Sequence, residues 1–159
     1  MDISVELNDI KFNYRVCILI INNDEMYLEC VKEANAYTLP GGRVRTLEFS
    51  KDAIIREMEE ELGISFNKED LELNNIVENK FILNNKINHE FCLVYALKNV
   101  TKYLDQLTNN KKNLDDQYNY YEWYKISELD NVNLLPEAYK KLVINGEVTS
   151  IIVDNVKGE

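Results

Sequence analysis

The stretch GRVRTLEFSKDAIIREMEEELGI, residues 42–64, combines a helical repeat of apolar side chains with a dense run of glutamates. Its apolar side chains recur three or four residues apart, at Ile54, Ile55, Met58 and Leu62. This spacing predicts a helix over residues 50–62, because side chains so spaced lie on one helix face. Ser50 is the expected N-cap, and Gly63 suits the position just past the helix end.

The glutamates of this stretch form a second stripe on the expected helix. At about 100° per residue, Glu57, Glu60 and Glu61 lie together beside the apolar stripe, whereas Glu59 points elsewhere. Carboxylates at that spacing repel one another by a few tenths of a kcal/mol per pair. A bound divalent cation would remove this repulsion, and magnesium prefers carboxylate oxygens. The competing interpretation is a solvated acidic face in which Arg56 pairs with neighbouring carboxylates.

The order of residues in this stretch resembles the Nudix box, the signature motif of the Nudix hydrolase family. Gly42 is followed after five residues by Glu48, and after seven more by REMEEELGI, residues 56–64. Every specified position of the motif is filled. A match of this length is specific, whereas an isolated run of glutamates is not.

Segments outside the box extend the resemblance. YTLPGG, residues 37–42, is similar to the aromatic-x-Leu-Pro-Gly-Gly approach that is common in the family. Residues 122–123 and 127–129 resemble the family's later strand and short helix. The similarity extends over residues 14–144, although residues 98–119 match no part of the family pattern.

The resemblance implies an α+β fold, an α/β/α sandwich around a mixed β-sheet, with one Nudix hydrolase domain over residues 1–159. It also implies magnesium as the cofactor, with manganese as a substitute. The metal ligands implied by motif position are Gly42, Glu48, Glu57, Glu60 and Glu61. The cations would neutralise a pyrophosphate and lower the pKa of a bound water.

The implied catalytic residues are Arg56, Glu57, Glu60 and Glu122. Arg56 would orient a box glutamate through a charge-assisted hydrogen bond. The general base of the family lies either in the box helix or on a later loop, so Glu57, Glu60 and Glu122 are all candidates. For Glu122 the competing interpretation is an ordinary surface carboxylate.

The reaction implied by the resemblance is hydrolysis of a phosphoanhydride bond in a nucleoside diphosphate linked to another group. Nucleotide sugars, ADP-ribose-like compounds and nucleoside triphosphates all fit that description. One alternative is a pyrophosphohydrolase restricted to triphosphates, which would sanitise the nucleotide pool. Another is a noncatalytic nucleotide sensor on the same fold. The proline that often follows the box in ADP-ribose hydrolases is missing, since the chain has prolines only at 40 and 136.

The main candidates for contacting the substrate are Tyr37, Arg43 and Phe81, and His89 and Tyr95 are weaker candidates for contacting its base. Phe81 can stack on a base. The competing interpretation is a core aromatic on a strand, because Phe is usually buried.

The rest of the chain predicts strands and a second helix. The expected strands cover residues 16–21, 26–31, 75–83, 90–97 and 120–124. His89 is expected in an Asn-rich turn, and a second helix is expected from Pro136 to about residue 143. Residues 98–119 read as an exposed polar insertion with some helix near 103–107, lacking a buried face and removable without loss of the fold.

Composition limits the partners and the location. The formal net charge of −10 disfavours binding to long nucleic acid, so a small nucleotide is the expected partner. A homodimer is compatible with the sequence. No leader-like or membrane-spanning segment is recognisable, which favours the cytoplasm. Cys17, Cys30 and Cys92 form no CxxC pair and are expected to be buried reduced thiols.

Overall fold

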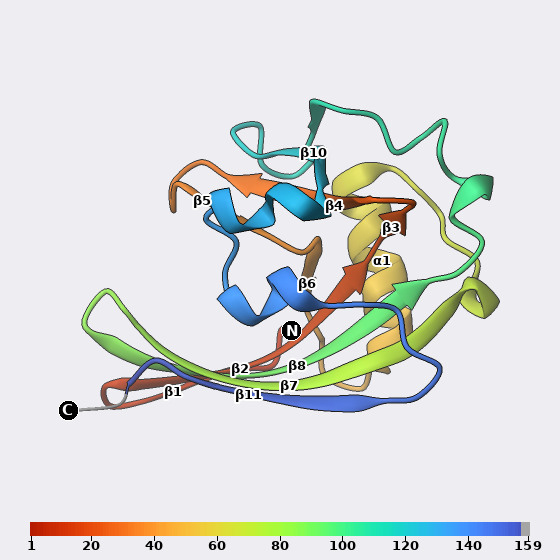
Figure 1. Ribbon diagram of the computed structural model, residues 1–159. Coiled ribbons are helices and arrows are strands. Elements are labelled where there is room, and N and C mark those ends of the chain that lie inside the picture. The colour runs from red at the N-terminus through yellow and green to blue at the C-terminus, as the bar shows by residue number, and fades with distance from the viewer. Residues whose placement is uncertain (157–159) are drawn as a thin grey trace.

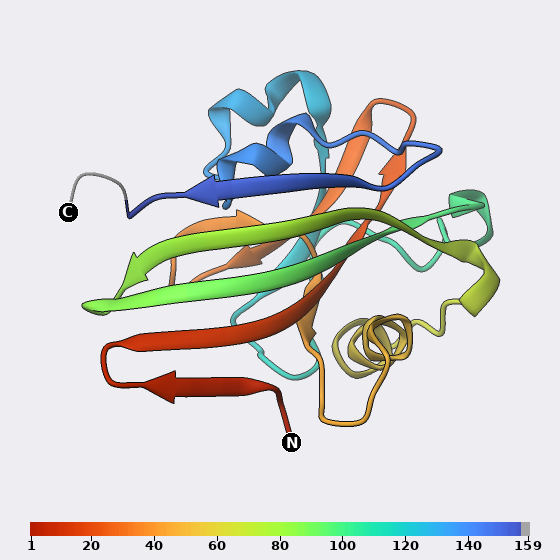
Figure 2. The same ribbon diagram turned by 90° about the horizontal axis from the view of Figure 1, so that it is seen from below.

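The computed structural model describes residues 1–156, which form two β-sheets, one α-helix and several short 3-10 helices. The larger sheet has the strand order β1 (Ser4–Leu7), β2 (Ile10–Leu19), β8 (Lys86–Leu97), β7 (Leu71–Leu83) and β11 (Thr149–Asp154), and β6 (Gly41–Arg43) pairs with β2. The second sheet has the order β3 (Ile21–Asn22), β4 (Glu25–Val31), β10 (Tyr120–Lys125) and β9 (Lys111–Lys112), and β5 (Ala36–Thr38) pairs with β4. Figure 2 shows the larger sheet face-on. It is mixed, because β2–β8 and β7–β11 pair in parallel whereas β7–β8 pair antiparallel.

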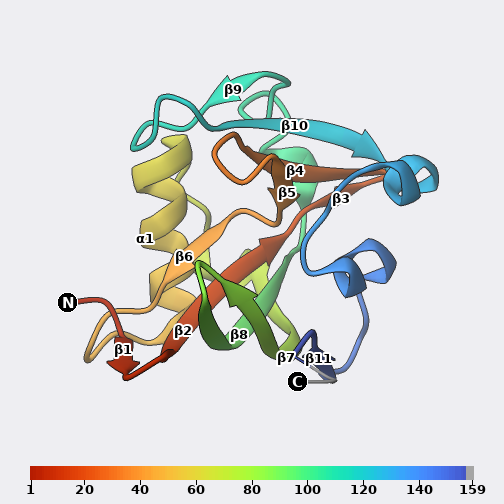
Figure 3. The same cartoon turned by 90° about the vertical axis from the view of Figure 1, so that its left-hand side faces the viewer.

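Helical segments cover both faces of the larger sheet (Figures 1 and 3). The helix α1 (Ser50–Leu62) packs against Val16 and Ile18 of β2, whereas Cys17 and Leu19 of the same strand pack on the other side. That other side is covered by the 3-10 helices η3 (Ile126–Asn131) and η4 (Glu137–Lys141). The expected α+β sandwich around a mixed sheet is therefore confirmed.

The ends of α1 show one correct and one wrong prediction. Gly63 ends the helix in the left-handed conformation, with φ of 67°, and its N–H bonds to the carbonyls of Glu59 and Met58. The N-cap is Phe49, without a side-chain cap, and not Ser50. Ser50 is already helical, and its Oγ lies 2.7 Å from the hydroxyl oxygen of Tyr95, so a tertiary hydrogen bond replaces the capping bond.

The expected strands are all present, but the turn containing His89 is not. β7 and β8 form a long hairpin whose turn residues Asn84 and Asn85 both have positive φ, which suits a tight hairpin turn. His89 lies within β8, and its ring makes an edge contact with Phe12. The second helix lies where it was expected but is the 3-10 helix η4, consistent with its five-residue length.

Residues 98–119 are not the exposed insertion that their composition indicated. Apart from the 3-10 turn η2 (Val100–Lys102) and β9, the segment is irregular, and no helix forms near 103–107. Tyr103 and Leu107 belong to the main hydrophobic core. The Tyr103 hydroxyl also donates a 2.6 Å hydrogen bond to Asp70. Deleting this segment would remove both Tyr103 and Leu107 from the core, which argues against the expectation that the fold survives its removal.

The cysteines are buried free thiols, as expected. Strand pairing nevertheless brings Cys17 and Cys92, distant in sequence, to an Sγ–Sγ separation of 3.4 Å. Within residues 1–156, no helix has both the length and the apolar character needed to cross a membrane.

Candidate active site

The two glycines of the loop allow it to lie against both β2 and α1. A Cβ on Gly41 would lie 2.2 Å from the carbonyl oxygen of Val16. A Cβ on Gly42 would lie 2.2 Å from the carboxyl carbon of Glu57. The absence of side chains therefore brings the loop backbone next to a carboxylate of the box helix.

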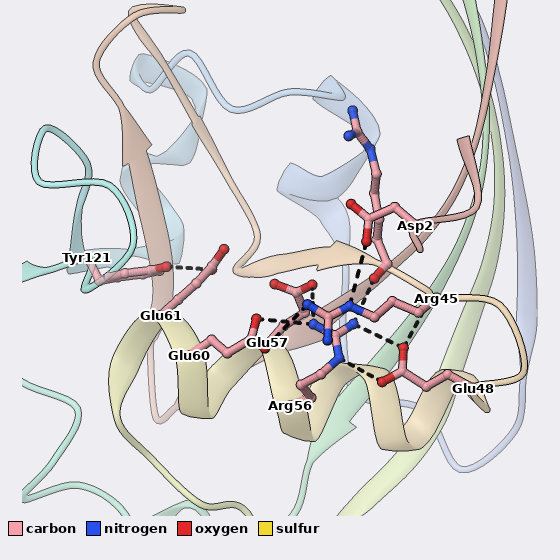
Figure 4. Close-up of polar contacts among 9 residues, drawn as sticks. Asp2, Arg45, Glu48, Arg56, Glu57, Glu60, Glu61 and Tyr121 are labelled. Atoms are coloured by element: carbon pink, nitrogen blue, oxygen red, sulfur yellow. Dashed lines mark hydrogen bonds and ion pairs between the residues drawn. The ribbon is translucent and has the colours of Figure 1, made fainter. Parts of the chain in front are cut away.

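Arg56 lies at the centre of the box and bonds three of its glutamates (Figure 4). Its guanidinium donates to Glu48 at 2.7 and 3.0 Å, to Glu57 at 2.8 Å and to Glu60 at 3.2 Å. It also bonds the backbone carbonyl of Arg43 at 3.0 Å. Because the side chain is only 18% exposed, these charge-assisted bonds fix the glutamates in place more firmly than an exposed pair would.

Glu48 anchors Arg56. Both of its carboxylate oxygens accept from the guanidinium, and Oε2 also accepts from the backbone N–H of Arg45 at 2.9 Å. The hydrogen bonds from Arg56 hold the pKa of Glu48 below its usual value. In this arrangement Glu48, which is expected among the metal ligands, orients Arg56.

Glu57, Glu60 and Glu61 have different surroundings on α1. Burial raises the pKa of Glu57, although Arg56 opposes the rise. Glu60 is the most exposed of the three carboxylates that Arg56 bonds. Glu61 turns away from Arg56 and accepts a 2.9 Å hydrogen bond from the Tyr121 hydroxyl (Figure 4). Burial, together with the nearby charge of Glu29, raises the pKa of Glu61 to about 8.

Glu29 is a further carboxylate of the site that the sequence reasoning missed. It lies on β4 and is 7% exposed, and its Oε1 accepts hydrogen bonds from Asn113 and Asn119, each at 3.2 Å. Burial raises its pKa to about 7. Asn113 also donates to Tyr121 at 3.0 Å, which links Glu29 to the partner of Glu61. The available signal was a single carboxylate within the apolar run of residues 26–31.

The structure does not bring Glu122 to this cluster. Neighbouring side chains of a strand point to opposite faces, and Tyr121 of β10 is the one that reaches Glu61. Glu122 accepts a hydrogen bond from Tyr124 at 2.9 Å on the other face. Its assignment as general base therefore lacks a geometric basis.

Tyr37 and Phe81, expected to contact substrate, line one cavity of about 590 Å³. The cavity lies between the larger sheet and the segment that leads into η4, and Arg15, Asn79 and Glu90 are among its other lining residues. Arg43 does not line it. None of these three polar residues was predicted from the sequence.

The donor chemistry of the box suits magnesium, although its carboxylates are not gathered. Among residues 1–156 no three acidic, histidine or cysteine side chains converge as a ready metal site. One guanidinium nitrogen of Arg56 bonds both Glu57 and Glu60, whereas Glu61 bonds Tyr121. They are nevertheless hard donors beside the Gly42 backbone, and the raised pKa values of Glu57 and Glu61 reflect burial of negative charge that a cation would offset.

Comparison with known proteins places this site in a family. The model of the NUDIX domain matches residues 11–144, so the chain belongs to the Nudix family. It is a Nudix pyrophosphohydrolase, the enzyme class in which nucleoside diphosphates linked to other groups are generally hydrolysed.

Solved structures show the same fold. A mutator MutT protein from Bacillus halodurans superposes with a TM-score of 0.65 at 16% identity, over 92% of this chain and 93% of that chain. A MutT Nudix hydrolase from Burkholderia pseudomallei gives 0.56 at 22% identity, over 73% and 84%. A structure from work on MutT of Aliivibrio salmonicida and Vibrio cholerae gives 0.52 at 20%, over 80% and 90%. No curated protein matches the chain.

Proposed function

We propose that this chain hydrolyses a phosphoanhydride bond in a nucleoside diphosphate linked to a second group, with magnesium held by Glu57, Glu60 and Glu61 and by the carbonyl of Gly42. The observation that carries the proposal is the close approach of the Glu57 carboxylate to Gly42, where a Cβ has no room. Magnesium takes oxygen ligands of this kind and completes its shell with water and substrate phosphates.

The residues of the box have different proposed roles in the reaction. When bound, the metal supplies charge neutralisation of the diphosphate and a lower pKa for a bound water. Glu48 fixes Arg56, and Arg56 fixes Glu57 and Glu60. Glu57 is the proposed general base, because its carboxylate lies beside the Gly42 backbone at the proposed metal site, where a carboxylate can accept a proton from a metal-bound water. Glu60 is the second candidate.

The cavity lined by Tyr37 and Phe81 is the proposed place for the nucleoside or the linked group. Its volume of about 590 Å³ suits a ligand of that size. Aromatic side chains offer stacking surfaces to any base, so this cavity accommodates several substrates. The proposal therefore names the class of bond that is broken and leaves nucleotide sugars, ADP-ribose-like compounds and triphosphates as the candidates.

A panel of these substrates, incubated with magnesium or manganese and read by mass spectrometry, tests the proposal. A nucleoside monophosphate plus a phosphorylated second group indicates cleavage of a linked diphosphate. Release of inorganic pyrophosphate indicates a triphosphate cleaved between its α and β phosphates, the pool-sanitising alternative. Nucleotide binding without turnover of any compound would instead make the chain a sensor.

A further inference from the structure

Two arginines face each other across paired strands near the box. Arg15 of β2 and Arg43 of β6 are directly opposite in the antiparallel register. Directly opposed residues project to the same face of a sheet, and like charges in such a pair are destabilising. On β6 the neighbouring Gly42 faces Glu57 of α1, so Arg43 projects to the other side, as Arg15 does together with Cys17.

Neither guanidinium has a partner in the part of the chain that the structure describes. No side-chain hydrogen bond or ion pair of Arg15 or Arg43 occurs within residues 1–156, and the Nε of Arg43 is buried without an acceptor. The other two arginines, Arg45 and Arg56, both pair with carboxylates. A buried donor without an acceptor costs free energy, so Arg43 is arranged for an acceptor that comes from outside the chain.

The two arginines link the aromatic cavity to the box glutamates. Arg15 lines the cavity that contains Tyr37 and Phe81. On the glutamate side, the backbone carbonyl of Arg43 accepts a 3.0 Å hydrogen bond from Arg56, which also bonds Glu57 and Glu60.

Arg15 also remains a cation in this position. Its burial acts to lower the pKa of the guanidinium, but the charge of Glu90 on the cavity wall contributes to an overall rise. Glu90 nevertheless forms no ion pair with it, and the five donors of the guanidinium stay available to a ligand.

We propose that Arg15 and Arg43 form an anion-binding subsite for a phosphate group of the substrate, at the junction between the glutamates and the cavity. The planar guanidinium fork matches phosphate oxygens bidentately. A diphosphate offers two anionic groups. The glutamates can bind one phosphate group only through a cation, whereas the two arginines can bind the other phosphate group directly. This inference deepens the proposed function and rests on it for the identity of the ligand.

Calorimetric titration with inorganic pyrophosphate, at low ionic strength and after divalent ions have been removed, tests the subsite without turnover. The unmodified protein should bind. Arg15→Gln and Arg43→Gln should each weaken binding by at least about tenfold, the scale of one lost charge-assisted hydrogen bond. Lys80→Gln is the matched control, since Lys80 of β7 projects to the opposite face of the same sheet and pairs with Asp154. Arg15→Lys keeps the charge but loses the fork, so it should bind with intermediate affinity.

Thermal unfolding of each variant separates loss of the subsite from loss of the fold. Removing one of two facing cations should leave the melting temperature of the ligand-free protein unchanged or higher. Absence of pyrophosphate binding by the unmodified protein, or equal affinity in the arginine variants and Lys80→Gln, would overturn the subsite. Because this readout needs no metal and no hydrolysis, arginine-dependent binding in a protein that turns over no substrate would refute the proposed function and leave the subsite standing.

Discussion

At the residue scale, the box glutamates are distinguished by their hydrogen-bond partners. Arg56 holds Glu57 and Glu60, Tyr121 holds Glu61, and Glu59 is exposed on another face of α1. Glutamates of one short run therefore have different surroundings, and we expect single substitutions to affect them differently.

Changing Glu60 or Glu61 to Gln removes an anionic oxygen and keeps the side-chain size. We expect turnover to fall by at least about a hundredfold, the scale of losing a major source of transition-state stabilisation. Glu59→Gln should keep near-normal turnover, because it loses only a surface contact with Ser65. Steady-state kinetics with magnesium checks this. Equal turnover in all three variants would mean that α1 does not carry the chemistry.

The pH dependence of stability should report the burial of Glu61. Its folded pKa of about 8 lies above the ordinary 4.5, so the folded state holds this proton more tightly than the unfolded state. The free energy of unfolding of the metal-free protein should therefore fall as pH rises from about 4.5 to 8. Glu61→Gln removes that contribution, so its stability relative to the unmodified protein should increase across this window. Urea denaturation at pH 5 and pH 8 measures the difference, and a constant difference would contradict the burial argument.

At the element scale, the segment of residues 98–119 shows how composition misleads. Its polar residues outnumber its apolar ones, yet Tyr103 packs on Phe66 and Leu107 lies in the main core. The Leu107 carbonyl also accepts a 2.6 Å hydrogen bond from the indole of Trp123. A few buried side chains and hydrogen bonds therefore hold the segment in place, and exposed residues lie between them.

Two leucines of this segment provide a matched test. Leu107 is 2% exposed and Leu114 is 67% exposed. Leu107→Ala should lower the free energy of unfolding by about 2–5 kcal/mol, the usual cost of truncating a buried leucine. Leu114→Ala should change it by less than about 0.5 kcal/mol. Similar midpoints for both variants in urea denaturation would restore the interpretation of the segment as a loose insertion.

At the scale of the whole molecule, the metal and the substrate are expected to bind together. Arg56 and Tyr121 occupy oxygens of the box carboxylates, and no three potential metal ligands converge in residues 1–156. Magnesium should therefore bind weakly alone and more tightly with a nonhydrolysable nucleotide, whose phosphate oxygens complete the shell. Calorimetry with and without the nucleotide measures this coupling. Equal affinities would show that metal and substrate share no ligands.

The amino-acid sequence by itself determined the features that depend on neighbouring residues. The apolar spacing in residues 50–62, Gly63 at the helix end and the glycine loop before the box all follow from local periodicity and backbone freedom. The family, and with it the sandwich fold, followed from the order of residues in the box. These signals are short-range, which is why one sequence was enough to recognise them.

Only the tertiary structure decided which distant residues meet. Glu29 and Glu61 are brought together through Tyr121 and Asn113, which come from other elements. Strand register decides that Arg15 and Arg43 lie opposite each other. The face to which each side chain points decides that Glu122 is excluded from the cluster. A shift of one residue in register would exchange the two faces, and local sequence does not encode the choice of pairing partner.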